Sequence, residues 1–485
     1  MCELDLPLKF AQKLYNEFAI RHPNAFYLRT RQRGMQNWDG KIHYITKTGQ
    51  FKIGLLPKVY DMCIEMGIKP KVVDMRQPLP KVSKVVTNIG KYKLRPEQEK
   101  AVKAVINNKI GNTPFHIGVL DYTVNAGKTL IMSSLYLSYK KQLKTLLITN
   151  DSDWLNQARE EFKQYLPGED ITFVQGKVLN WSNFTIGMVQ SISRNMRFYQ
   201  KELSQIDMVL VDEADQGGSK QYQNVITRLF NTRIRIGLSG TIYMSKLAKD
   251  KVKNMNLECF FGKVIAEFKL KDSIKKGYST KTIVKMVPGK PWYGNWESDC
   301  ISYKEIYDDS ITENNTAWTM AYNRLRWNIN QGRYPALVVC KHIAHCENLY
   351  KFFKKKLGDA YNIAYVHVNT PSKLRQQIMK DFREGKIDIL VSTTIIARGK
   401  NFPKLKYLLN TASMDSQEKS IQFLGRLVRT DESKNKVYLD DLHYPGPYLD
   451  RHGKHRKQYY QRQELKVILL DKLWKKHPNH SLIKS

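Results

Sequence analysis

The stretch Thr123-Val-Asn-Ala-Gly-Lys-Thr129 decides the fold. It lies between the strand-like run Ile117–Leu120 and the helix-like run Leu130–Tyr139, and this order is typical of a phosphate-binding loop. In such a loop the backbone N–H groups and the N-terminus of the helix face the phosphates. Lys128 would then contact the β- and γ-phosphates, and Thr129 would bind Mg²⁺.

Two positions of this loop depart from the general pattern. Tyr122 stands in place of the first glycine, and Asn125 stands in place of a second one. Asn tolerates left-handed backbone geometry better than most residues, so we expect the loop to close. Ala126 and Gly127 complete the predicted nucleotide contacts. On its own, this half-motif also fits an ordinary turn.

A second motif, Met208-Val-Leu-Val-Asp-Glu-Ala-Asp215, makes the ordinary turn a weak explanation. Four apolar residues followed by Asp-Glu describe a buried strand that carries carboxylates at its C-terminal end, where open parallel sheets bind ligands. Asp212 would hold Mg²⁺, directly or through water, and Glu213 would orient or deprotonate the attacking water. A capped helix start would explain Asp212 and Asp215 but not Glu213. Together the motifs predict an ATPase that uses ATP and Mg²⁺.

Short β-rich runs alternate with longer helical runs in two successive regions, residues 89–250 and 251–445. This alternation predicts an α/β fold with two tandem units, each a parallel sheet covered by helices. A helix is expected at Asp153–Tyr165. The further predicted strands are Leu146–Thr149, Thr185–Val189, Met208–Val211, Ile234–Leu238, Ala336–Cys340, Ile363–His367, Ile387–Ser392, Tyr407–Asn410 and Lys436–Asp440.

Both ends of the chain are basic. Residues 1–88 are interpreted as a small N-terminal α+β domain that binds nucleic acid. We expect small β-hairpins at Lys41–Ile45 and Gln50–Ile53, a helix at Pro57–Met66 and a linker at Met75–Val85. Residues 446–485 are expected to form a basic helical tail. Arg451–Ser485 carries ten Lys or Arg and two acidic residues, and it either lies on nucleic acid or is a solvated face.

The overall charge points to a polyanionic partner. Eighty Lys and Arg against 45 acidic residues leave a formal net charge of +35. Such an excess attracts polyanions, of which nucleic acid is the commonest, although a merely soluble basic surface is the alternative.

Cysteines and hydropathy narrow the class of protein further. The six cysteines include no C-x-x-C pair, so neither a zinc site nor a disulfide framework is indicated. No apolar run is long enough for a membrane span, and the first residues lack the features of a secretory signal. We therefore expect a cytoplasmic protein, in the host cytoplasm if the chain is viral.

Further motifs, in order, make residues 92–440 resemble helicase superfamily 2. Arg95-Pro-Glu-Gln98 resembles the Q motif, which implies that Arg95 lies near the nucleotide and Gln98 recognises adenine. Thr149–Gln157 resembles motif Ia, and Val189-Gln190-Ser191 a second backbone-contacting segment, which implies that Thr149 and Gln190 contact nucleic acid. Ser239-Gly240-Thr241 resembles motif III, which implies that these residues couple hydrolysis to strand movement.

The second unit continues the resemblance. Ala336–Lys341 looks like motif IV. Ser392–Asn401 resembles motif V, which implies that Thr393 and Thr394 lie near nucleic acid and Gly399 near the nucleotide. Gln422-Phe-Leu-Gly-Arg-Leu-Val-Arg429 matches motif VI, which implies a coupling role for Gln422 and arginine fingers at Arg426 and Arg429. Planar, bidentate cations suit the charge that grows on a transferring phosphoryl group.

The literal D-E-A-D does not indicate a DEAD-box RNA helicase, because the P-T-R-E-L-A and T-P-G-R segments are missing and Ile421–Arg429 replaces H-R-I-G-R-T-G-R. Instead, Asn37-Trp-Asp-Gly-Lys41 and Phe51-Lys-Ile-Gly-Leu55 resemble the N-terminal domain of phage UvsW-type helicases. That resemblance implies a DNA helicase that acts on branched DNA, in fork regression, branch migration and recombination-linked repair. The expected partner is DNA that is branched or has single-stranded/duplex junctions.

The residues alone leave several alternatives open. Trp38 either stacks on a base, with Arg31, Arg33 and Lys41 on phosphates, or packs in a small hairpin core. The substrate is alternatively RNA, and the motor is alternatively a duplex translocase that never separates strands. A binding protein with an inactive ATPase fold is a third alternative, which the intact Lys128, Asp212, Glu213, Arg426 and Arg429 argue against.

Overall fold

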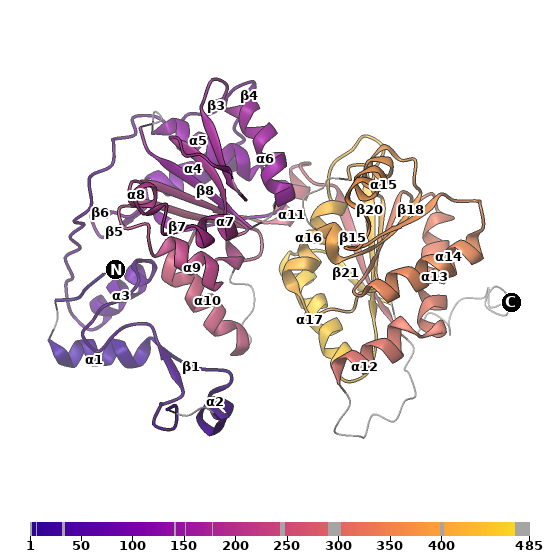
Figure 1. Cartoon of the computed structure of the whole chain (residues 1–485), viewed down its shortest axis with the longest axis horizontal. Helices are drawn as coiled ribbons and strands as arrows, with labels where there is room; N and C mark the ends of the chain where they lie inside the picture. The colour runs from indigo at the N-terminus through magenta and orange to yellow at the C-terminus, as the bar shows by residue number, and fades with distance from the viewer. Residues whose placement is uncertain are drawn as a thin grey trace. The chain divides into compact units, whose positions relative to one another are not determined.

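In the computed structural model the chain forms two compact units, Met1–Phe268 and Lys269–Ser485, each built on its own sheet (Figure 1). The predicted α/β fold with two tandem parallel-sheet units is confirmed. The structure describes residues 2–5, 7–31, 34–139, 142–150, 152–176, 178–242, 248–289, 302–397 and 402–470.

The first unit contains an eight-stranded sheet in the order β10-β9-β11-β8-β12-β13-β7-β14, parallel except for β10. All residues of β7, β8, β12 and β13 are buried, as expected for parallel strands covered on both faces. The strands are β7 Ile117–Tyr122, β8 Thr145–Thr149, β9 Ile171–Gln175, β10 Val178–Leu179, β11 Phe184–Met188, β12 Met208–Asp212, β13 Ile234–Ser239 and β14 Val264–Phe268. The helices of this layer are α4 Pro96–Ile106, α5 Lys128–Ser138, α6 Ser152–Tyr165, α7 Val189–Arg194, α8 Gln200–Ser204, α9 Lys220–Ile226 and α10 Ala248–Phe261.

The first unit extends past the boundary expected at residue 250. β14 pairs in parallel with β7, so the chain completes the first sheet at Phe268 before it enters the second unit at Lys269. Gly262 marks a turn just before β14, but a turn at this position does not distinguish an eighth strand from the start of a new unit.

The N-terminal region packs on this unit through a shared core. Leu14, Phe18 and Phe51 lie in the same buried cluster as Val209 and Phe261. The elements are α1 Leu8–Glu17, β1 Ala19–Arg21, α2 Ala25–Arg31, β2 Lys41–His43, η1 Ile53–Leu55 and α3 Leu56–Glu65, followed by the short pairs β3 Asn88–Ile89 with β4 Tyr92–Lys93 and β5 Lys109–Ile110 with β6 Thr113–Pro114.

The hairpin prediction for the N-terminal region was right in part. β2 pairs antiparallel with β1 from earlier in the chain, instead of with its sequence neighbour. Ile45 and Phe51 do form an antiparallel bridge, and Phe51 also bridges to Cys2. Local alternation identified the extended segments but did not identify their partners. The helix expected at Pro57–Met66 is α3, and residues 75–83 contain no helix or strand, as expected of a linker.

The second unit contains a parallel seven-stranded sheet in the order β17-β18-β16-β19-β20-β15-β21. Its strands are β15 Lys281–Pro288, β16 Ala336–Cys340, β17 Ile363–Val366, β18 Ile389–Thr393, β19 Tyr407–Asn410, β20 Lys436–His443 and β21 Val467–Leu469. Its helices are α11 Leu270–Lys275, α12 Tyr303–Tyr307, the π-helix η3 Asp308–Thr312, α13 Asn315–Ile329, α14 Ile343–Leu357, α15 Ser372–Glu384, the short η4 Thr394–Ala397, α16 Gln417–Leu427 and α17 Leu449–Arg462.

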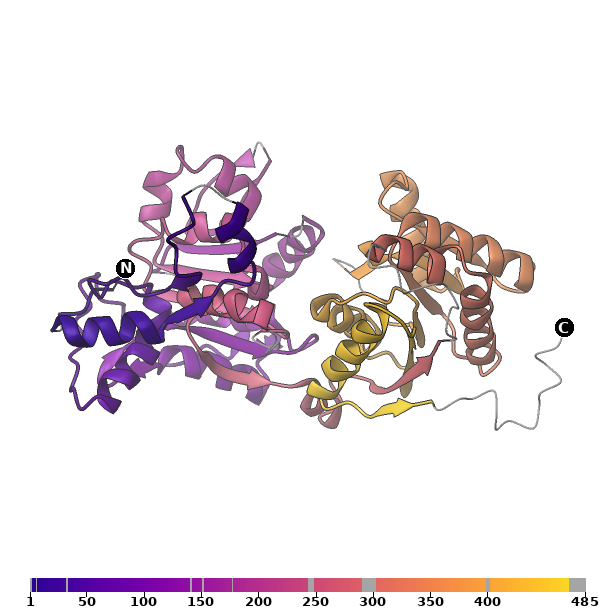
Figure 2. The ribbon, with the colours of Figure 1, turned by 90° about the horizontal axis from the view of Figure 1, so that it is seen from below.

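The predicted basic tail requires correction. Its first part is helical, as expected, but α17 is an integral helix of the second unit: Arg456 has no exposed surface and its guanidinium forms an ion pair with Asp441 at 2.8 Å. The chain then adds β21 to the edge of the sheet beside β15 (Figure 2). The sequence did not indicate this, because the many positive charges of the segment hid the buried positions that recur at helical spacing. Residues 471–485 lie outside the described residues.

Within the described part of the chain, no helix is both long enough and apolar enough to cross a lipid bilayer.

Candidate nucleotide-binding site

The phosphate-loop motif forms a tight turn between β7 and α5. Asn125 (φ 68°) and Gly127 (φ 74°) both adopt the left-handed backbone, so Asn125 supplies the conformation expected of it. Gly127 is the N-cap of α5, which begins at Lys128. The first-turn N–H groups of a helix lack partners within the helix and attract anions, so the loop has the geometry of a phosphate site.

The Q-motif residues donate hydrogen bonds to backbone carbonyls of this turn. Gln98 accepts a hydrogen bond from the Arg95 N–H and donates one from its side-chain amide to the Ala126 carbonyl, both at 2.8 Å. The Arg95 guanidinium donates to the Asn125 carbonyl at 3.3 Å. A Cβ at Gly127 would collide with the Gln98 amide. Gln98 has no exposed surface, so in this structure it braces the loop, and its recognition of adenine stays a prediction.

The carboxylates lie at the same sheet edge as the loop. β13 pairs with both β12 and β7, which places the C-terminal ends of the three strands side by side. Asp212 is buried, and its Oδ1 lies 3.5 Å from the Lys128 Nζ. Glu213 follows with a left-handed backbone, φ 51°. The loop lysine and the strand carboxylate therefore meet, as their motifs predict.

The donors at this edge fit Mg²⁺. The Asp212 Oδ1 is buried and receives no hydrogen bond from the described residues. Mg²⁺ is typically held by one or two carboxylates together with substrate phosphates and water. The described residues contain no cluster of three or more His, Cys, Asp or Glu side chains suited to a metal, and such a site does not require one.

The motif III residues connect this edge to the loop. Ser239, the last residue of β13, donates from Oγ to the Asp215 Oδ1 at 2.9 Å. Its Oγ also accepts from the Thr241 N–H at 3.1 Å. A Cβ at Gly240 would lie 3.0 Å from the Thr123 Cα, so only glycine lets this segment approach the start of the phosphate loop closely. The contacts provide a physical route for the predicted coupling role.

Tyr222 is a residue of this site that the motifs did not identify. It lies on α9 with 1% of its surface exposed, and its hydroxyl has no hydrogen-bond partner among the described residues. Burial, followed by the negative charges of Glu213, Asp212 and Asp215, raises the pKa of Tyr222 well above its usual value. No spacing rule connects Tyr222 to the D-E-A-D run, because α9 brings it back after a turn.

The predicted nucleic-acid contacts of the first unit gather at adjacent strand ends. Thr149 ends β8 in register with Met188, which ends β11. Gln190 follows on α7 and donates from its side-chain amide to the Asn150 carbonyl at 3.4 Å. Thr149 is buried and Gln190 is partly exposed, so the segments share one edge, while direct contact with nucleic acid stays a prediction.

In the second unit, the motif V and VI residues lie on β18, η4 and α16. Thr393 ends β18 and is buried, and the Thr394 hydroxyl accepts a hydrogen bond from Lys419 at 3.3 Å. Gln422 and Arg426 are both partly exposed on α16 at a spacing of four residues, which is one helix face. Arg429 follows the helix. Gly399 lies outside the described residues.

Trp38 has a structural role in its turn. Its indole N–H donates to the Lys41 carbonyl at 2.8 Å, and its ring packs edge-on against His22 with centroids 5.7 Å apart. These contacts favour packing over base stacking. Lys41 is exposed.

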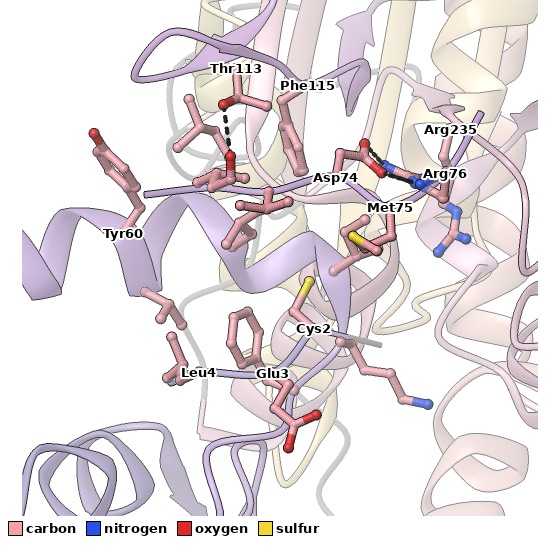
Figure 3. A pocket seen from close by; sticks show the side chains of 18 of the residues that line it. Cys2, Glu3, Leu4, Tyr60, Asp74, Met75, Arg76, Thr113, Phe115 and Arg235 are labelled. Atoms are coloured by element: carbon pink, nitrogen blue, oxygen red, sulfur yellow. Dashed lines mark hydrogen bonds and ion pairs between the residues drawn. The ribbon is translucent and has the colours of Figure 1, made fainter. Parts of the chain in front are cut away.

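A separate cavity of about 580 Å³ lies within the first unit, between the N-terminal segment, the linker and the amino-terminal ends of β7 and β13. Asp74 pairs with Arg76 at 2.7 Å in its wall (Figure 3). Arg235, at the start of β13, is 7% exposed, and its Nε has no hydrogen-bond partner among the described residues. The phosphate loop follows the opposite ends of these strands, so the cavity is distinct from the nucleotide site.

Two protein-family models match the chain, one in each of its two units. Residues 91–244 match the model of the type III restriction enzyme res subunit. Residues 321–431 match the helicase conserved C-terminal domain. The chain belongs to helicase superfamily 2. The two matched segments contain the loop and carboxylates of the first unit and motifs V and VI of the second, and the superfamily 2 prediction is confirmed.

Curated relatives of this superfamily 2 member are distant. The chain is 22% identical over 72% of its length to the putative ATP-dependent helicase IRC3 of Saccharomyces cerevisiae. It is 23% identical over 73% of its length to putative helicase 22 of a Sulfolobus islandicus filamentous virus. The matches cover 51% and 64% of those proteins, so the chain spans about half to two thirds of the length of these relatives.

Solved structures share the fold at low identity. The DNA-bound type ISP restriction-modification enzyme LlaBIII matches 81% of this chain and 32% of its own, with a TM-score of 0.57 and 14% identity. RNA-bound Dbp5 of S. cerevisiae matches 79% of this chain and 91% of its own, with a TM-score of 0.53 and 14% identity. The crystal structure of UvsW from phage T4 aligns over 96% of both chains, with a TM-score of 0.44 and 19% identity.

Proposed function

We propose that the chain is an ATP-dependent motor that moves along DNA and unwinds or remodels branched DNA. The observation that carries the ATPase part is the 3.5 Å pair between Lys128 and Asp212 beside the N-terminus of α5. A loop lysine and a strand carboxylate in this relation are the parts that a nucleoside triphosphate and its cation require.

In the proposed reaction, the chain supplies binding and orientation. The N–H groups of the Gly127–Thr129 turn bind the phosphates, and Lys128 balances their charge. Asp212 and Thr129 would hold Mg²⁺, which would neutralise negative charge on the phosphates. Glu213 orients the attacking water or accepts its proton. Arg426 and Arg429 stabilise the charge that develops on the transferring group.

The contacts of motif III support the proposed coupling of hydrolysis to movement. Ser239 bonds to Asp215 of the D-E-A-D run, and Gly240 packs on the start of the phosphate loop. A change at the γ-phosphate would reach the end of β13 through these two contacts. We propose that Thr149, Gln190, Thr393 and Thr394 contact the nucleic-acid backbone and shift along it as the nucleotide turns over.

Branched DNA is proposed as the substrate because the Asn37–Lys41 turn resembles that of UvsW-type helicases. The net charge of +35 supports a nucleic-acid partner of any kind. RNA, and duplex DNA translocated without strand separation, are the competing substrates.

The test measures ATP hydrolysis with a panel of nucleic acids at matched phosphate concentration. We expect forked DNA and four-way junctions to stimulate turnover more than single-stranded DNA, duplex DNA or RNA. Lys128→Ala is the matched control, and it should remove the stimulated activity. Greatest stimulation by RNA would overturn the DNA assignment.

A second assay separates a helicase from a duplex translocase. Strand displacement from a forked duplex is compared with displacement of the third strand from a triplex, which requires movement along duplex but no unwinding. Strand displacement is expected. Triplex displacement without strand displacement would replace unwinding by translocation alone.

A further inference from the structure

A small basic cavity in the N-terminal region brings Lys41, one of the predicted nucleic-acid contacts, together with residues that no motif identified. It has a volume of about 600 Å³ and lies between α2, the β1–β2 pair and the turn that precedes β2. Figure 1 shows α2 and β1 near each other. Arg21, Arg29 and Lys41 line it together with Phe26, and all four side chains are exposed. Asp39 is its acidic residue.

Two of these cations oppose each other directly. Arg21 and Lys41 are partners in the antiparallel β1–β2 register, so their side chains leave the same face at neighbouring positions. Like charges in this relation are destabilising. Neither side chain forms an ion pair within the described residues, and the Asp39 carboxylate is engaged by His43 at 2.6 Å. An anion placed between Arg21 and Lys41 would remove the repulsion.

An unusually exposed aromatic ring lies beside this charge. Phe26 is 79% exposed, more than its neighbour Tyr27 at 53%. The Tyr27 ring is covered by the Arg31 guanidinium, 4.4 Å from its centroid. The Phe26 ring makes no aromatic or cation–π contact with any described residue. One face of a large apolar ring is therefore open next to three cations, which is the combination that base stacking with flanking phosphate contacts uses.

The turn Asn37–Lys41 holds these groups in place. Gly40 adopts φ 77°, and a Cβ there would lie 3.1 Å from the Ala25 Cβ, so the turn packs closely on the start of α2. Asp39 accepts from the Lys41 N–H at 2.9 Å, and Trp38 donates to the Lys41 carbonyl. The Trp-Asp-Gly residues thus act as scaffold, which leaves the side chains around the cavity to make contact.

We propose that this cavity binds a single-stranded segment of nucleic acid, with a phosphate between Arg21 and Lys41, a second phosphate at Arg29, and an unstacked base on Phe26. The proposal rests on the proposed nucleic-acid motor and adds a contact outside both sheet units' motifs. Base–aromatic stacking with flanking cations is the usual chemistry of single-strand binding. An acidic peptide would meet the charge but would leave the ring without a planar partner.

The test measures equilibrium binding of the full chain, without ATP, to two single strands of equal length. One is oligothymidylate and the other carries abasic sites, so that the phosphates are the same and the bases are missing. Phe26→Ala should weaken oligothymidylate binding about five-fold or more and leave the abasic strand unchanged. Phe26→Tyr should restore binding, and Phe26→Leu should not. Phe198→Ala, which removes another ring of 78% exposure, is the matched control.

Substitution of the cations should change the salt dependence of binding instead of the preference for bases. Arg21→Ala or Arg29→Ala should reduce the slope of log affinity against log salt by about 0.7 per lost phosphate contact, on either strand. Equal loss on both strands for Phe26→Ala, an unchanged salt slope, or equally strong competition by polyglutamate would overturn the proposal. ATP hydrolysis with nucleic acid is measured on the same samples to separate two outcomes. If nucleic acid stimulates turnover but Phe26→Ala does not change binding, this site alone is rejected. If the unaltered chain does not bind nucleic acid, the proposed motor is rejected as well.

Discussion

The two units contain the same kind of parallel sheet but use buried carboxylates in opposite ways. In the first unit, Asp212 has an oxygen that receives no hydrogen bond from the described residues and lies 3.5 Å from Lys128. In the second, Asp441 accepts from Arg456, Tyr460 and Asn410. A buried polar group without a partner is costly, whereas a complete network is rigid. The first carboxylate is thus prepared for a ligand, and the second one holds the fold.

The rigid carboxylate also has an indirect use. Asp441 anchors α17 through Arg456, which donates further to the Met414 and Leu442 carbonyls. α17 packs against α16, the helix that presents Gln422 and Arg426. The buried charge of the second unit therefore fixes the helix that carries Gln422 and Arg426, whereas that of the first unit lies at the proposed nucleotide site.

The largest effect is expected from breaking the rigid network. Arg456→Met would leave the Asp441 carboxylate buried without its counter-charge, so the free energy of unfolding of the second unit should fall by about 3–5 kcal/mol. Denaturant unfolding with a probe in each unit measures the loss. The double variant Arg456→Met/Asp441→Leu should recover most of it. If the single variant is as stable as the parent, the contrast between Asp441 and Asp212 is wrong.

The next effect is on activity alone. Lys128→Ala removes the cation that we propose to face the phosphates, so ATP turnover should fall by roughly 100-fold or more, with the unfolding temperature and DNA binding largely unchanged. Arg426→Ala should keep ATP binding and lose turnover. Hydrolysis rates and nucleotide binding are measured on the same preparations. Robust turnover in Arg426→Ala would refute the arginine-finger assignment.

A smaller effect concerns acid stability of the second unit. Complete burial lowers the pKa of His345 to about 3. The unfolded chain binds a proton at this residue below about pH 6.5, whereas the folded chain does not until about pH 3. The contribution of His345 to stability is therefore full above pH 6.5 and declines as the pH falls, by roughly 1.4 kcal/mol per unit well inside this window.

The comparison of the parent with His345→Gln isolates the contribution of His345 to the pH dependence of stability, since both proteins share all other titrating groups. We expect the parent to lose unfolding free energy more steeply than the variant between pH 6 and pH 4. Parallel pH profiles would show that His345 is protonated in the folded protein.

Sequence and structure agree best where short-range pattern and burial act together. The strands at Ala336–Cys340 and Tyr407–Asn410 have the expected bounds, and the Gly-Lys-Thr loop and the Asp-Glu strand end meet as expected. Motifs predict these contacts because the residues that make them lie within a few positions of a strand end.

Features that depend on distant pairing were not visible in the sequence. β14 and β21 join sheets from positions where the local pattern shows a boundary or a basic tail. Tyr222 approaches the carboxylates only through the path of α9. Phe26 was concealed because its exposure depends on how α2 packs against Gly40, while Trp38, the more obvious aromatic, is used inside the turn.

The smallest effect tests a second buried charge in the first unit, and it has the opposite sign. Burial lowers the pKa of Arg235 to about 10, and the nearby Arg76 adds repulsion. Its one described hydrogen bond, to the Phe260 carbonyl, is long at 3.5 Å. Because an unpaired buried charge costs free energy and an apolar side chain of similar length does not, Arg235→Met should raise the unfolding free energy of the first unit by about 1 kcal/mol.

Arg233 on the same segment is the matched control, because it is paired with Asp74 at 3.4 Å and donates to the Arg76 and Gln77 carbonyls. Arg233→Met should therefore destabilise the unit, although both substitutions remove one arginine from the same short segment. Denaturant unfolding followed by a probe in the first unit gives both signs in one experiment. Equal destabilisation by the two variants would mean that the Arg235 charge has a partner in the folded protein, as the Arg233 charge does.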